Sequence, residues 1–139
     1  MYSTKHEINK LCHEILNCAI EVHRVLGPGL LESVCEKCMI FELEDRGFSV
    51  RSQLQLPLVY KGHLLETNLR LDLLVEETVI CELKSVDSFI PIHEAQIISH
   101  LKLMAKPKGL LINFNCTNIM KNGQKTFVTQ KFAELPDGY

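Results

Sequence analysis

The strongest constraint on the fold is a predicted hairpin near the middle of the chain. Residues 69–75 and 78–83 are two mostly apolar runs of strand length, and Glu76-Glu77 lies between them as a tight connection. With a two-residue turn at this point, Leu71 would face Glu82 and Asp72 would face Cys81. Asp72 and Glu82 would then lie within about one residue of each other across the ladder, roughly 5–8 Å apart.

These apolar strands carry three charged side chains. Successive strand residues alternate between faces, so Glu82 and Lys84 are expected to project to the same side. Two carboxylates in a partly buried site repel each other, and a hard divalent cation such as Mg²⁺ would remove that repulsion. Lys84 could then orient or deprotonate a water molecule and stabilise charge on a phosphorus centre. The alternative is a structural ion pair between Lys84 and Asp72 or Glu82 on an exposed sheet face.

Helices and further strands are predicted on both sides of the hairpin. A capping box at Thr4 to Glu7 begins a first helix that Gly27-Pro28-Gly29 ends. A second helix is predicted over residues 30–46 and a third over 91–105, while 48–66 contains short strands broken by turns. Residues 108–115 form a buried strand, 126–130 another strand, and the rest a frayed tail. This order predicts an α/β fold, a mixed β-sheet flanked by α-helices.

The predicted third helix places polar residues on its apolar side. Gln96 and His100 share one half of the helical wheel with Ile97 and Leu101, so both are expected to face the core. A buried amide and imidazole need partners, which a polar site at the sheet or nearby backbone groups would supply. The second helix is less informative, because Glu32 borders its apolar arc while Glu42 falls inside it.

Bulk properties set the class of protein. The 139 residues, 46% of them hydrophobic, predict a single domain over 1–139. No run approaches the length of a membrane span and the first ten residues do not resemble a signal peptide, so a cytoplasmic, intracellular protein is expected. The six cysteines are expected to be buried free thiols, with metal or redox chemistry at Cys35 and Cys38 as the alternative. Residues 101–139 carry six Lys/Arg and two Asp/Glu, which suits either phosphate contact or a solvated face.

Several segments together resemble one known family. Residues 29–35, GLLESVC, resemble the signature of the GxxExxY proteins, a group within the PD-(D/E)XK nuclease superfamily. The likeness continues through RLD at 70–72, CELKSV at 81–86 and HEAQ at 93–96, and it ends near GLLINF at 109–114. It covers roughly residues 15–115 in the family's order and spacing.

The resemblance implies a restriction-endonuclease-like core and a set of site residues. Asp72 and Glu82 would bind the metal, Lys84 would be the catalytic lysine, Glu32 an additional helix-borne acid and metal ligand, and Gln96 an amide near the metal. The pattern from Gln96 onward is similar to the Gln-x-x-x-Tyr of RecB-type exonucleases. Two positions depart from the family, because Cys35 and His100 stand where tyrosines are expected.

The leading functional hypothesis is hydrolysis of phosphodiester bonds in nucleic acid, foremost DNA, with Mg²⁺ or Mn²⁺ as cofactor. No membrane partner is expected, and a homodimer is a further option. One alternative is a catalytically silent module that keeps the nuclease fold and binds nucleic acid or a protein. Another is a metal-dependent phosphoesterase acting on small nucleotides.

Overall fold

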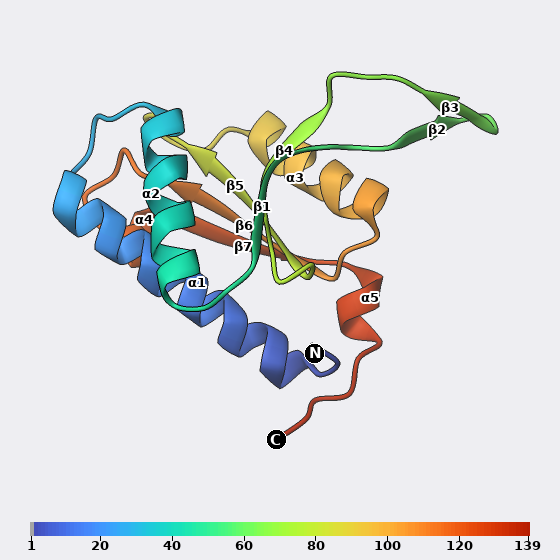
Figure 1. Cartoon of the computed structure of the whole chain (residues 1–139), viewed down its shortest axis with the longest axis horizontal. Coiled ribbons are helices and arrows are strands. Elements are labelled where there is room, and N and C mark those ends of the chain that lie inside the picture. The colour runs from blue at the N-terminus through green and yellow to red at the C-terminus, as the bar shows by residue number, and fades with distance from the viewer. Residues whose placement is uncertain (1) are drawn as a thin grey trace.

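A computed structural model describes residues 2–139 (Figure 1). A five-stranded sheet has the order β1-β4-β5-β6-β7, and β2 and β3 form a separate two-stranded ribbon. The strands are β1 (Val50–Gln55), β2 (Leu58–Tyr60), β3 (His63–Leu65), β4 (Arg70–Val75), β5 (Val79–Lys84), β6 (Lys108–Asn113) and β7 (Gln124–Val128). The helices are α1 (Lys5–Leu26), α2 (Glu32–Asp45), α3 (Pro91–Met104), α4 (Ile119–Asn122) and α5 (Gln130–Ala133).

The sheet is mixed because α3 carries the chain back across it. β5 and β6 pair in parallel, while β1–β4, β4–β5 and β6–β7 pair in antiparallel fashion. Parallel neighbours need a crossover, and the α3 helix provides it. Gly109 lets α3 approach β6 closely, since a Cβ there would lie 3.0 Å from Ile97 Cδ1. This mixed sheet with flanking helices confirms the predicted fold class.

Apolar residues fill both faces of the sheet. The larger cluster joins α1 and α2 to alternate residues of the central strands, including Leu73, Cys81 and Ile112. The smaller cluster joins α3 to Leu71, Ile80 and Leu111. α1 and α2 therefore cover one face of the sheet and α3 covers the other. Strand β5, which carries Glu82 and Lys84, lies between these two helical layers.

The β4–β5 connection differs from the expected two-residue turn. Leu73 pairs with Cys81 and Val75 with Val79, so three residues, 76–78, form the loop. Continuing this register places Asp72 opposite Glu82, and the expectation that it faces Cys81 was wrong by one residue. The reason is the backbone of the loop, because Glu76 and Glu77 both adopt positive φ of 53°.

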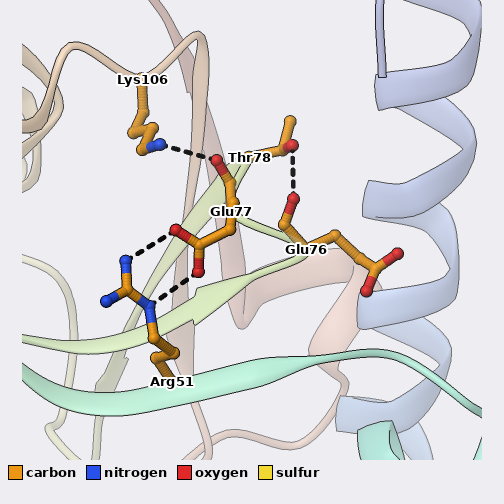
Figure 2. A network of polar contacts seen from close by, with 5 residues as sticks. All are labelled: Arg51, Glu76, Glu77, Thr78 and Lys106. Atoms are coloured by element: carbon orange, nitrogen blue, oxygen red, sulfur yellow. Dashed lines mark hydrogen bonds and ion pairs between the residues drawn. The ribbon is translucent and has the colours of Figure 1, made fainter. Parts of the chain in front are cut away.

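Polar contacts hold this loop at the end of the hairpin far from Asp72 (Figure 2). The Thr78 hydroxyl donates to the carbonyl of Glu76 at 2.7 Å. The Glu77 carboxylate accepts two hydrogen bonds from Arg51, and its carbonyl accepts one from Lys106 Nζ at 2.7 Å. These bonds offset the cost of the left-handed backbone at two non-glycine residues.

The C-terminal segment was wrongly expected to be frayed. α4 and α5 lie within it, and β7 begins two residues before the predicted strand. The carbonyls of Pro136 and Asp137 accept hydrogen bonds from the backbone of Lys5 and His6, each at 2.9 Å. The tail thus satisfies two N–H groups that the first turn of α1 cannot pair internally. Thr4 caps that turn as predicted, accepting from Glu7 N at 3.1 Å.

The cysteines carry no disulfide within the described residues, and all six are free. Four are buried, while Cys38 and Cys116 are half-buried. Burial raises the pKa of Cys12 and of Cys18 to about 11, so these thiols are protonated at neutral pH. The four buried cysteines are core residues, as predicted, whereas Cys38 and Cys116 are less buried than expected.

Candidate active site and metal centre

Strand β5 presents two charged side chains to α3. Glu82 is 4% exposed, and its Oε1 lies 2.6 Å from Nδ1 of His100, itself buried. Lys84, two residues along, approaches Gln96 Oε1 with Nζ at 3.5 Å. Glu82 and Lys84 therefore project to the same side, as strand alternation predicted. Their partners, His100 and Gln96, lie one turn apart on α3.

Gln96 is exposed, and the expectation that it faces the core was wrong. The helical wheel placed it within the buried half of α3, but only Ile97, His100 and Leu101 of this helix are buried. Ile97 and Leu101 of α3 pack close to Gly109 of β6, and Gln96 precedes this packed stretch. Gln96 consequently lies at the rim of the site, where its amide reaches Lys84.

Asp72 occupies a gap between β4 and β5. The ladder between these strands ends at the Leu73–Cys81 pair, and beyond it the Asp72 carboxylate takes the place of a backbone partner. Its Oδ2 accepts a hydrogen bond from Leu83 N at 2.8 Å. The Asp72 side chain is thereby held against β5 beside Glu82.

The two carboxylates influence each other. Burial is the main cause that raises the pKa of Glu82, and the hydrogen bond from His100 opposes it. The negative charge of Asp72 and a carboxyl–carboxyl contact with it raise the Glu82 pKa further. The predicted convergence of Asp72 and Glu82 is therefore present, with an electrostatic cost that a cation would relieve.

Glu36 of α2 lies near Asp72, and the sequence analysis assigned no role to it. Its Oε1 accepts from Gln53 Nε2 at 2.7 Å, and the same amide lies 3.4 Å from Asp72 Oδ1. Burial, and then the charge of Asp72, raise the pKa of Glu36. Its position one turn after Glu32 is a signal that could have pointed to it.

Glu32 lies beside the end of β5 rather than with Asp72 and Glu82. Its Oε1 accepts from Ser85 N at 3.2 Å, and the Ser85 hydroxyl donates to Leu30 O at 2.8 Å. An open hollow of about 590 Å³ adjoins this contact, lined by residues 29–33 with Ser85 and Asn115. Glu32 thus borders the candidate site from the α2 side.

Asp72 and Glu82 together suit a hydrated divalent cation more than a metal enclosed by protein ligands alone. Within residues 2–139, no group of three or more His, Cys, Asp or Glu side chains is gathered closely enough to hold a metal. Two convergent carboxylates remain, and Mg²⁺ is commonly bound by one or two carboxylates with water and substrate phosphate completing its octahedron. In the same described range Lys84 forms no ion pair with Asp72 or Glu82, which argues against the purely structural alternative.

The two positions that depart from the family pattern lie in different surroundings. Cys35 is buried in the core between α2 and the sheet, where its thiol contributes packing. His100 is buried against Glu82. Its Nδ1 meets the Glu82 carboxylate, which supplies the polar partner that a buried imidazole needs.

The sequence profile of the PD-(D/E)XK nuclease superfamily matches residues 9–127, which include α1 to β7 almost entirely. The chain belongs to this superfamily. Its five-stranded mixed sheet with flanking helices is consistent with the restriction-endonuclease-like fold. No curated protein and no solved structure gives a significant match. Within residues 2–139, no helix has both the length and the apolar character to cross a bilayer.

Proposed function

We propose that the protein is a metal-dependent nuclease that hydrolyses phosphodiester bonds of nucleic acid, foremost DNA. The observation that carries this proposal is the convergence of Asp72 and Glu82 beside Lys84 in a chain of the PD-(D/E)XK superfamily. The segment GLLESVC at residues 29–35 supports the finer assignment to the GxxExxY group, and Gln96 on α3 supports the likeness to RecB-type exonucleases. We assign the whole chain, 1–139, to a single nuclease domain.

Asp72 and Glu82 would hold the metal. A bound Mg²⁺ or Mn²⁺ supplies Lewis acidity toward phosphate oxygens and lowers the pKa of a water molecule. Asp72 keeps its orientation through Leu83 N, and His100 fixes the Glu82 carboxylate by its Oε1, so Oε2 would be the oxygen that binds the metal. Hydrogen bonds from neighbouring groups to metal-binding carboxylates, such as these two, orient the ligands.

Lys84 and Gln96 would act on the substrate side. The Lys84 ammonium is free of carboxylate partners within the described residues and can orient the attacking water or stabilise charge on the phosphate. Gln96 holds Lys84 by accepting from its Nζ. Glu32 would assist as a further acid from the α2 side, where it contacts Ser85 N.

Metal titration and cleavage together test the proposal. Isothermal titration calorimetry of the wild type should show Mn²⁺ binding that Asp72→Ala abolishes, while the exposed Asp45→Ala retains it as a matched loss of one carboxylate. With Mn²⁺ the wild type should cleave at least one of single-stranded, double-stranded or branched DNA, and Asp72→Ala none. Equal Mn²⁺ binding by the wild type and Asp72→Ala would rule out this metal site. Binding of DNA without cleavage of any substrate would instead favour the silent binding module.

A further inference from the structure

The ribbon of β2 and β3 stands away from the rest of the molecule. Figure 1 shows it at the end of a long excursion between β1 and β4, and we call residues 56–69 the arm. Its strands have three residues each and pair only with each other, with Val59 opposite Leu64 and Tyr60 opposite His63. An isolated two-stranded ribbon is at best marginally stable in water, so binding to a partner would stabilise this arm.

Both faces of the arm expose large apolar side chains. Val59 and Leu64 form a cross-strand pair on one face and are 64% and 75% exposed. On the other face Tyr60 and Leu65 are 58% and 44% exposed. Apolar groups gathered in this way on a projecting element indicate a contact surface.

The charge of the arm favours contact with bases over contact with a duplex backbone. The arm carries one lysine, Lys61, one histidine, His63, and one acid, Glu66. A protein that lies along duplex DNA relies on several Lys or Arg contacts to phosphates, which this arm lacks. Base faces are apolar and aromatic, but a duplex hides them, so the arm suits nucleic acid whose bases are unpaired.

The base of the arm leads into the candidate active site. A hollow of about 320 Å³ is lined by Leu69, the last residue of the arm, and by Gln96 and His100 of the site, with Ile92, Ala95 and Leu103 as apolar lining. Asp72 follows Leu69 by three residues along β4. A strand held on the arm would therefore continue directly toward the proposed metal ligands.

We propose that the arm is a wedge that binds a fork in nucleic acid, where the two strands of a duplex separate. Each face then meets the unpaired bases of one strand, with Tyr60 stacking on one side and the Val59–Leu64 pair packing on the other. Lys61, whose Nζ lies 5.5 Å from the Tyr60 ring centroid, neutralises a phosphate at the tip. This inference rests on the proposed nuclease function, since it names the substrate form that the site receives.

Binding of defined DNA forms without divalent metal tests the wedge. Fluorescence anisotropy in EDTA would compare a forked duplex, the blunt duplex of the same paired sequence and the free single strand. The wild type should bind the fork most tightly. Tyr60→Ala and Leu64→Ser should each weaken fork binding about tenfold, and neither should change binding of the blunt duplex. Phe41→Ala removes an aromatic side chain of α2 that is even more exposed than Tyr60, and it should leave fork binding unchanged.

Three results would each contradict the wedge proposal. The first is equal affinity for the fork and the blunt duplex, and the second is unchanged fork binding in both arm variants. The third is a dimer, seen by light scattering, that Leu64→Ser dissociates. The last result would make the arm an interface between copies of the chain. Because binding is measured without metal, the wedge can hold although Mn²⁺ cleavage fails, and cleavage can hold although the wedge fails. Unchanged melting temperatures of the variants verify folding, since all three side chains are exposed.

Discussion

The Asp72 carboxylate accepts a hydrogen bond from the backbone of Leu83, with 2.8 Å between Oδ2 and N, at the point where β4 leaves β5. A side chain here replaces a backbone partner of the ladder. The replacement fixes a carboxylate beside Glu82, the residue that precedes Leu83. The sheet therefore lacks a backbone hydrogen bond at this position, and two like charges are held side by side instead. Such an arrangement is typical of functional sites more than of stable cores.

Neutralising Asp72 should stabilise the metal-free protein. The folded-state pKa of Glu82 is raised, so the stability linked to this group is full below its unfolded pKa and is lost as pH rises through the folded value. Asp72→Asn removes one cause of that shift and keeps an oxygen to accept from Leu83. In EDTA at pH 7 we expect a gain of about 1 kcal/mol in unfolding free energy.

The pH dependence distinguishes this gain from a general packing effect. The advantage of Asp72→Asn should shrink as the pH falls, because protonation of Glu82 removes its repulsion with the Asp72 carboxylate in the wild type. Urea unfolding at several pH values, with EDTA present, measures it. Saturating Mn²⁺ should reverse the order of stability, because only the wild type binds the metal. A gain that is constant from pH 4 to pH 8 would contradict the electrostatic explanation.

Removing the imidazole of His100 should destabilise the protein. His100→Leu leaves the Glu82 carboxylate buried without its donor, at an expected cost of about 2 kcal/mol at pH 7. The loss of that hydrogen bond raises the Glu82 pKa further, so the cost should grow with rising pH. His100→Gln keeps an N–H donor and should lose less. Urea unfolding of both variants in EDTA checks the prediction, and equal losses would show that packing alone is responsible.

The sequence was sufficient to predict the fold class and the convergence of Asp72 and Glu82. Strand alternation placed Glu82 and Lys84 on one side, because two-residue periodicity depends only on backbone geometry. The register was wrong by one residue because turn length depends on the backbone of Glu76 and Glu77. Two glutamates give no signal for positive φ, unlike the Asn-Gly or Gly-Gly pairs of ordinary hairpin turns.

Other parts of the site depended on tertiary arrangement. A helical wheel orders residues around α3 but does not say which part of the helix the sheet covers, so Gln96 was placed in the core although it is exposed. Glu36 was missed because its partner Gln53 lies on β1, and no local pattern joins the two. The pairing of His100 with Glu82 likewise required the crossing of α3 over β5.

Truncating Gln96 should reduce activity without removing it. Gln96→Ala deletes the acceptor that holds Lys84 at 3.5 Å, so the ammonium samples more positions. We expect kcat for DNA cleavage to fall about tenfold, with Mn²⁺ affinity unchanged because no ligand is lost. Gln130→Ala, which truncates an exposed glutamine of α5 away from the site, serves as the matched control. Full activity of Gln96→Ala would remove this residue from the proposed site.

Lys84 offers the sharpest separation of metal binding from chemistry. Lys84→Ala should retain Mn²⁺ affinity, or bind slightly more tightly, because a positive charge is removed from beside the two carboxylates. Cleavage should fall by about 10²–10³ in kcat, the range seen when one group that stabilises transition-state charge is deleted. Lys102→Ala, an exposed lysine of α3, is the matched control. Calorimetry and single-turnover cleavage on the same preparations give both quantities. Loss of Mn²⁺ binding together with cleavage would mean that Lys84 supports the site structurally, and unchanged cleavage would exclude it from the mechanism.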